Sequence, residues 1–345
     1  MRDVSAAQPR SEGEPWFLAV DAGNSKTLAL VIDREGKTRG RGRGARGDIY
    51  GTETTADAEG AVFGAVEAAL ADAGAAASDI HSAAFRMAGV DFPEDAVFWH
   101  ERIRERLAGI GRWSVKNDAF ASLRLIDGTG VGVSITVGTG PAIAARSVDG
   151  REECSGMYVF DDLGGQGLGN SALAAACRAW MGIGPRTRLA DALCEQYGVR
   201  DPGELRHRFA RRFGALPPSE LWKASRLVLA LAGEGDEVAC GIVRDQADAL
   251  VRYATWCVAR VGTDLDAGEL PVLLNGSVVT SEHPAMRRAL IDRLREVAPA
   301  AAVSVARSSP LQGAVLDALA EGGVILTPGL ITQLRDDHPD GFLRT

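Results

Sequence analysis

The chain has 345 residues, of which 46% are hydrophobic and 24% are charged, an ordinary composition for a globular protein. This length exceeds what a single core usually holds, so we expect two domains of about 100 to 200 residues each. The formal net charge is −8, which argues against a nucleic-acid partner because nucleic-acid-binding proteins are usually basic.

The cysteines and the apolar segments exclude further classes of protein. The five cysteines are scattered and show no CxxC spacing, so neither a disulfide framework nor a structural zinc site is expected. No apolar run is long enough to span a membrane, and residues 1–14 lack the apolar segment of a signal peptide. We therefore expect a cytoplasmic protein without a membrane partner, and a disordered segment at 1–14.

The first part of the chain alternates strand and helix patterns. Short apolar runs between turn formers predict strands, and apolar residues at helical spacing predict helices. In chain order, strands are expected at 16–22, 27–33, 38–43, 81–90 and 112–119, and helices at 55–74 and 94–109. Three strands followed by helix, strand, helix and strand predict an α/β layout with a mixed sheet, as in ribonuclease-H-like domains.

A basic, glycine-rich stretch, KTRGRGRGARG, occupies residues 37–47. Two interpretations stay open for it. The first is a solvated loop, and the second is a contact with an anion or a substrate.

The opening hairpin pattern returns at 133–152. Aligning Gly23 with Gly138 superimposes two units of strand, glycine turn and strand, which indicates an internal repeat. The later chain is mostly helical, with a long helix near 236–262 and a strand and turn near 270–284. The expected organisation is a first domain, a second domain with helical insertions and a C-terminal tail, at residues 15–118, 119–323 and 324–345.

The two glycine turns carry the first indication of function. Backbone N–H groups in a tight glycine turn converge on one point and bind anions, phosphates above all. Two such turns at the starts of paired domains would hold a polyphosphate from both sides. Asp21, at the end of the first strand, is suited to hold Mg²⁺ through water, because magnesium keeps much of its hydration shell.

Five motifs in chain order carry a resemblance to a known family: VDAGNSKT, MAGVDFPED, KNDAFASL, ITVGTGPAI and LLNGSVV. They resemble the actin/hexokinase/Hsp70 (ASKHA) superfamily. Within it they are similar to the N-acetylglucosamine-kinase-like group, which is classed with the BadF/BadG/BcrA/BcrD ATPases and the activators of 2-hydroxyacyl-CoA dehydratases. The resemblance covers residues 15–323. It implies an α/β fold of two ribonuclease-H-like, actin-like ATPase domains flanking an interdomain cleft, with ATP and Mg²⁺ as cofactors.

The resemblance also implies roles for individual residues. The first phosphate motif implies Asp21 as the metal-associated residue, and Asp118 matches the catalytic base. The remaining nucleotide-binding positions come from the first phosphate motif, the second phosphate motif and the adenosine motif. They are Gly23, Asn24, Ser25, Lys26, Gly138, Thr139, Gly140, Gly276 and Ser277.

Asp118 also has a chemical argument and a competing one. A sugar hydroxyl that attacks a γ-phosphate needs its proton accepted, and a carboxylate can accept it. Alternatively, Asp118 caps the helix expected from Ala119, since aspartate is a good helix N-cap.

Four further residues are candidates for substrate contact. Asp48 stands where the family commonly has an asparagine that hydrogen-bonds sugar hydroxyls. Asp162 or its neighbour Asp161, depending on the alignment, matches the aspartate of the family's GDEGSG motif, which is altered in this chain to FDDLGGQGLGNSAL at 160–173. In FRMAGVDFPED, residues 85–95, Gly89 and Asp91 are candidates for substrate contact, but the acids of DFPED equally suit the first turn of the next helix.

The resemblance implies an ATP-dependent kinase that phosphorylates a hydroxyl of a sugar or amino sugar of the N-acetylglucosamine or glucosamine kind. The alternatives are an ATPase switch that activates a partner enzyme, and a degenerate nucleotide-binding regulator. No cysteine lies near either phosphate turn, which weighs against the activator because such activators hold an iron–sulfur cluster. The family's sugar kinases are often dimers, so a homodimer is expected.

Overall fold

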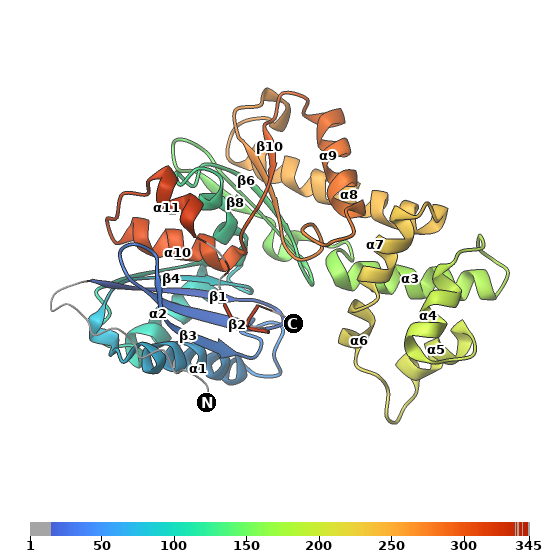
Figure 1. Cartoon of the computed structure of the whole chain (residues 1–345), viewed down its shortest axis with the longest axis horizontal. Helices are drawn as coiled ribbons and strands as arrows, with labels where there is room; N and C mark the ends of the chain where they lie inside the picture. The colour runs from blue at the N-terminus through green and yellow to red at the C-terminus, as the bar shows by residue number, and fades with distance from the viewer. Residues whose placement is uncertain (1–14, 335, 337, 340, 344–345) are drawn as a thin grey trace, which may run out of the picture. The chain divides into compact units, whose positions relative to one another are not determined.

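The computed structural model describes residues 15–334, 336, 338–339 and 341–343. The expected disordered segment at 1–14 lies outside the described residues. The chain divides into two compact units (Figure 1): the described residues up to Gly132 with those from Ala306 on, and Val133–Val305. This division differs from the boundaries expected at 118/119 and 323/324, because the chain returns to its first unit after Val305.

The first unit is built on a five-stranded sheet with strand order β3-β2-β1-β4-β5. Strands β1, β4 and β5 are parallel, and β2 and β3 are antiparallel to their neighbours. The elements of this unit include the five predicted strands and the two predicted helices, each within a few residues of its expected bounds. They are β1 Trp16–Ala22, β2 Thr27–Ile32, β3 Thr38–Gly44, α1 Thr55–Ala73, η1 Ala77–Asp79, β4 Ile80–Met87, α2 Pro93–Arg106, β5 Arg112–Asn117, η2 Asp118–Leu125, α10 Pro310–Glu321 and α11 Pro328–Gln333.

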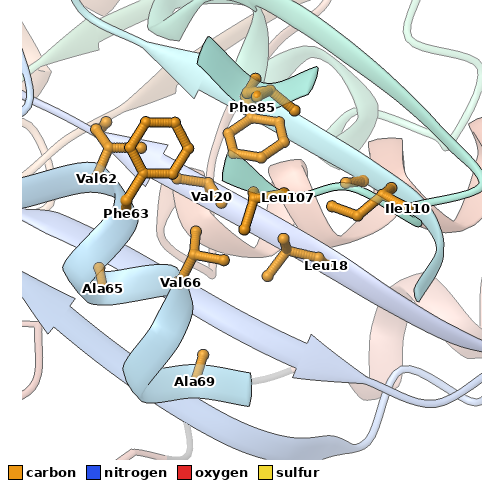
Figure 2. Close-up of a cluster of buried hydrophobic side chains, with 14 of the residues drawn as sticks. Leu18, Val20, Val62, Phe63, Ala65, Val66, Ala69, Phe85, Leu107 and Ile110 are labelled. Atoms are coloured by element: carbon orange, nitrogen blue, oxygen red, sulfur yellow. The ribbon is translucent and has the colours of Figure 1, made fainter. Parts of the chain in front are cut away.

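One face of this sheet is covered by α1 and α2. Figure 2 shows Leu18 and Val20 of β1 and Phe85 of β4 packed against Val62 and Val66 of α1. Helix α1 begins with a capping box, in which Thr54 accepts from the Asp57 backbone N–H and the Asp57 side chain accepts in return. It ends at Gly74, whose left-handed φ of 65° suits glycine.

Strand β3 contains most of the basic 37–47 stretch, so this stretch is not a loop. Its glycines pack directly on the backbone of α1: a Cβ added at Gly40, Gly42 or Gly44 would lie 2.1, 1.8 or 2.1 Å from a carbonyl oxygen of that helix. Only glycine permits such an approach of strand to helix. The repeated glycines therefore serve packing.

The opposite face of the sheet is covered by α10 and by the C-terminal segment. Leu28, Leu30 and Ile32 of β2 form a core cluster with α10, and Leu334 belongs to it. Leu330 and Ile331 of α11 pack against this cluster, and Figure 1 shows α10 and α11 on this side. The segment expected to be a tail is thus part of the first unit's core, because it buries apolar side chains.

A buried ion network explains why η2 and α10 belong to the first unit. Arg86 of β4 is fully buried, and its Nε lies 2.6 Å from Oδ2 of Asp317 on α10. Arg124 of η2 approaches the other carboxylate oxygen of Asp317 at 2.5 Å. Breaking such a pair would strand a buried charge, so these three elements form one body.

The second unit repeats the topology of the first. Its five strands have the order β10-β9-β6-β7-β8, which read backwards is the order of the first sheet, and this confirms the predicted internal repeat. Its elements are β6 Gly132–Val137, β7 Pro141–Arg146, β8 Glu152–Cys154, η3 Gly156–Tyr158, α3 Gly164–Trp180, α4 Leu189–Tyr197, α5 Pro202–Ala210, α6 Pro218–Trp222, α7 Ser225–Gly233, α8 Glu237–Arg260, η4 Leu265–Ala267, β9 Val272–Asn275, α9 Ala285–Val297 and β10 Val303–Val305. Across the described part of the chain, no helix combines the length and apolar character needed to cross a membrane.

Candidate functional site

The first glycine turn joins β1 to β2. The Gly23 backbone N–H donates to the Lys26 carbonyl at 2.9 Å, which closes the turn directly after Asp21. Asn24 is exposed, and Ser25 and Lys26 are half-buried. Burial lowers the pKa of Lys26, while the negative charge of Asp21 opposes that shift. The predicted phosphate and metal residues therefore lie together in one turn.

The loops that follow β3, β4 and β5 begin at the same edge of the sheet. Ala22 of β1 is in register with Met87 of β4, which is in register with Asn117 of β5. Because the three strands are parallel, the residues that follow them meet at one edge. This edge brings together the carboxyl groups of Asp21, Asp48, Asp91 and Asp118.

The crowding of these carboxyl groups changes their pKa values. Burial, reinforced by the charges of Asp21, Asp91 and Asp48, raises the pKa of Asp118 to about 8. Burial also raises the pKa of Asp21 to about 6, against the opposing charge of Lys26. Burial and the charges of Asp48 and Asp95 raise the pKa of Asp91 to about 6. Perturbed carboxyl groups of this kind are typical of functional sites.

Asn117 holds two parts of this cluster. Its Nδ2 donates to Asp91 Oδ1 at 2.8 Å, and its Oδ1 accepts from the Ala119 backbone N–H at 2.9 Å. Asn117 is therefore the side chain that caps η2. The alternative role of Asp118 as the N-cap goes instead to its neighbour, although Asp118 also receives a hydrogen bond from Ala119. The sequence analysis gave no role to Asn117, whose one signal was its place directly before Asp118 in the NDA motif.

The loop after β3 places Asp48 beside Gly89. Asp48 is buried, and its Oδ1 accepts from the Tyr50 backbone N–H at 2.9 Å. Gly89 has a φ of +75°, and a Cβ built there would lie 2.3 Å from Asp48 Oδ1. The close fit therefore requires glycine at position 89.

The acids of DFPED divide between the two interpretations. Asp95 Oδ2 accepts from the backbone N–H groups of Asp91 and Phe92 at 3.0 and 2.8 Å, and its Oδ1 accepts from Tyr50 Oη. It is thus a structural acid at the start of α2. Asp91 instead contributes its charge to the cluster around Asp118.

Arg46 is a residue that the sequence did not single out. Its Nε donates to the Asn24 carbonyl at 2.6 Å, and its Nη1 donates to the Gly51 carbonyl. It therefore ties the first glycine turn to the loop that carries Asp48. Its place in the basic stretch was the one available signal.

The second glycine turn joins β6 to β7. Gly138 N donates to the Gly140 carbonyl at 3.0 Å, so Gly138, Thr139 and Gly140 form a tight turn. Gly276, directly after β9, has a φ of +91°, and a Cβ there would lie 2.4 Å from the Val137 carbonyl oxygen. The exposed Ser277 follows it. The predicted second phosphate motif and adenosine motif therefore meet at one edge of the second sheet.

The altered segment before α3 distinguishes its two aspartates. The Tyr253 hydroxyl of α8 donates to Asp161 Oδ2 at 2.7 Å. Asp162 Oδ2 accepts from Asn170 Nδ2 of α3 at 2.6 Å. Both carboxylates are exposed, so each remains accessible while held by a different helix.

Metal-binding clusters made of protein ligands alone are absent from the described residues: no group of three or more His, Cys, Asp or Glu side chains there could hold an ion. The five cysteines form no disulfide among the described residues. A divalent cation at Asp21 would therefore need water and phosphate oxygens as its remaining ligands, which is common for magnesium.

Known proteins resemble this chain along most of its length. N-acetyl-D-glucosamine kinase of Dictyostelium discoideum is 25% identical over 317 residues, which are 88% of this chain and 97% of that protein. The crystal structure of the "Putative N-acetylglucosamine Kinase" of Chromobacterium violaceum matches with a TM-score of 0.66 at 22% identity, covering 88% of this chain and 98% of that one. A ROK family glucokinase from Streptomyces griseus, in complex with glucose and AMPPNP, matches with a TM-score of 0.54 at 19% identity over 88% and 98% of the two chains.

These structural similarities establish the fold class: a mixed α/β chain with two five-stranded sheets, as in these two-domain structures. The family comparison goes further, since the model of the BadF/BadG/BcrA/BcrD ATPase family matches residues 18–320. The chain therefore belongs to the BadF/BadG/BcrA/BcrD ATPase family.

Proposed function

We propose that this protein is an ATP-dependent kinase that phosphorylates a hydroxyl group of a sugar or amino sugar. The observation that carries the proposal is Asp118, a carboxyl group with a pKa of about 8 at the sheet edge that also carries the first phosphate turn. The similarity to an N-acetyl-D-glucosamine kinase over 88% of the chain supports the substrate class.

Asp118 would act as the general base. The acceptor hydroxyl oxygen attacks the γ-phosphorus, its proton passes to the Asp118 carboxylate, and the bond from the γ-phosphorus to the leaving ADP oxygen breaks. A base works best when its pKa lies near the operating pH. Burial, together with the neighbouring carboxylates, raises the pKa of Asp118, so in its deprotonated form it can accept a proton from a weakly acidic alcohol.

The two glycine turns would bind the nucleotide. Lys26 offers positive charge, and Gly23, Asn24 and Ser25 complete the first turn. The second turn and the adenosine motif contribute Gly138, Thr139, Gly140, Gly276 and Ser277.

Asp21 would hold Mg²⁺. The carboxyl groups at this edge outnumber the one lysine whose charge opposes the raised pKa of Asp21. An excess of carboxyl groups fits a divalent cation. When bound, Mg²⁺ neutralises phosphate charge.

The acceptor would contact Asp48 and Asp118, with Gly89 leaving room for the Asp48 carboxylate. Asp162 is proposed as a further substrate contact. Asp48 is buried and belongs to a cluster of like charges, which favours an acceptor that brings hydrogen-bond donors or a positive charge.

A coupled assay of ADP release over a panel of sugars tests the function. ADP release that depends on one sugar class, with one phosphate transferred per ADP, is the expected result. ADP release that ignores every acceptor would support the ATPase switch, and nucleotide binding without turnover would support the regulator. The homodimer and the cytoplasmic location stay predictions, and the dimer is checked by sizing the protein across micromolar concentrations.

A further inference from the structure

The N-terminus of α3 is joined to the second glycine turn through its first backbone N–H groups. Gly165 N donates to the Gly138 carbonyl at 2.9 Å, and Gln166 N donates to the Thr139 carbonyl at 3.0 Å. Gly164 N donates to the side chain of Gln246 on α8, at 3.0 Å from Oε1. The first N–H groups of a helix have no partner within the helix. Here three of them bond to the turn and to α8.

Gln246 is buried, with 4% of its surface exposed. Since Gly164 N–H is a donor, the group that faces it must be the carbonyl Oε1, which fixes the orientation of the amide. Among the described residues, Nε2 has no hydrogen-bond partner. The structure thus uses the acceptor of Gln246 and leaves its donor unused.

The backbone around the hydrogen bond from Gly164 to Gln246 is tightly packed. Gly164 has a φ of +74°, and a Cβ there would lie 2.7 Å from the Thr139 carbonyl oxygen. A Cβ at Gly167 would lie 1.9 Å from the Asp162 carbonyl oxygen and 2.8 Å from Gln246 Nε2. Gly164 therefore packs directly against the turn at Thr139, so its position and that of the turn depend on each other.

We propose that Gln246 is a positioning residue for nucleotide binding. It holds the start of α3 in place, and α3 in turn holds the carbonyl groups of Gly138 and Thr139, so that the turn presents its geometry to phosphate. The inference rests on the proposed role of this turn in binding nucleotide phosphates. In this proposal, the N-terminus of α3 supports the turn through its hydrogen bonds to the carbonyl groups of Gly138 and Thr139.

The test compares substitutions that keep or remove the acceptor. Gln246→Met removes it and leaves Gly164 N–H buried without a partner, so the Kd for ADP should rise about tenfold. Gln246→Glu keeps an acceptor at the N-terminus of α3, where a negative charge is tolerated. Its Kd should stay within about threefold of the parent value. Calorimetric titration of the full chain with ADP measures both values without any acceptor sugar.

A matched control uses another buried glutamine on a helix. Gln312 of α10 is 3% exposed and belongs to the first unit, so Gln312→Met should lower the melting temperature and leave the Kd for ADP within about twofold. Equal ADP affinity in Gln246→Met and the parent, or an equal loss in Gln312→Met, would overturn the proposal. If Gln246→Glu fails to fold, the contrast between the two methionine variants still decides.

The same variants separate this inference from the proposed function. In an active enzyme, Gln246→Met should raise the KM for ATP and leave the KM for the sugar unchanged. If the protein binds ADP but phosphorylates no sugar, the kinase proposal fails, and the calorimetric contrast still tests Gln246. If it phosphorylates sugar and the contrast is absent, only the role of Gln246 fails.

Discussion

The two glycine turns occupy equivalent positions in two sheets of the same topology, yet they are built from different chemistry. The first turn lies among Asp21, Lys26 and Asp118, whose pKa values are all displaced from their usual ranges. The second turn consists of Gly138, Thr139 and Gly140 and is held by backbone hydrogen bonds to α3. The two sheets share their strand order, but the turns are closed by different hydrogen bonds, and the charged groups gather around the first turn.

This difference indicates how each turn should fail. The first turn depends on ionisation, so changes of charge and of pH should affect it most. The second depends on close approaches between backbones, so added volume should affect it most. Four predictions, from the largest expected effect to the smallest, test this contrast.

The largest effect is expected at Asp118. Asp118→Asn removes the proton acceptor and leaves the phosphate turns intact, so kcat should fall by about 10² to 10⁴, the usual contribution of a general base. The Kd for ADP should change little. Steady-state kinetics and calorimetry check the two statements, and unchanged turnover would refute the role of Asp118.

The second turn should respond to volume. Gly164→Ala forces a side chain into a left-handed conformation and against the Thr139 carbonyl oxygen, at a cost of roughly 1 to 3 kcal/mol in the free energy of unfolding. ADP affinity should fall as well. Gly241→Ala, on α8 with open space around it, is the control and should gain up to about 1 kcal/mol. Equal effects in the two variants would contradict the packing argument.

Asp48 should set the preference between acceptors. Its buried carboxylate only accepts hydrogen bonds when ionised, so a protonated amine suits it better than an N-acetyl group does. We expect kcat/KM to favour glucosamine over N-acetylglucosamine. Asp48→Asn should reduce that preference by roughly 1 to 3 kcal/mol. Glu53→Gln, an exposed change in the same loop, should leave the ratio unchanged, and a parent enzyme that favours the acetylated sugar would exclude the idea.

The smallest effect concerns the stability of the ligand-free protein against pH. The pKa of Asp118 rises from 3.8 to about 8 on folding, so the folded chain binds a proton that the unfolded chain releases. Stability from this group is complete below about pH 4 and is lost as the pH rises to about 8.

Asp118→Asn carries no such charge, so its free energy of unfolding should exceed that of the parent by roughly 1 to 2 kcal/mol at pH 8, a value discounted for the partial exposure of the side chain. The two proteins should be close at pH 5. Urea unfolding at both values measures the gap, with the exposed Asp266→Asn as control. If the difference in the free energy of unfolding between the two proteins does not grow with pH, the ionised Asp118 does not destabilise the folded chain.

Much of the fold could be predicted from the sequence, because its signals are local. The alternation of apolar runs with turn formers placed β1, β2, α1 and β4 within a few residues of their observed bounds, and the repeat at Gly138 predicted the second sheet. The C-terminal segment escaped prediction. Its apolar residues become a core element only against β2 and α10, which are distant in the sequence.

The sequence by itself determined which chemical groups the candidate site contains, since motifs such as DAGNSKT and NDA carry their residues in fixed order. The tertiary structure decided what those groups do to one another. The pKa of Asp118 is raised because several loops bring carboxyl groups to one edge of the sheet. Asn117 is the cap because η2 begins at Asp118. Gln246, distant from both turns in sequence, reaches Gly164 only through the packing of α8 against α3. Electrostatic coupling and packing act through space, and a linear pattern does not encode distances between segments that are far apart in the chain.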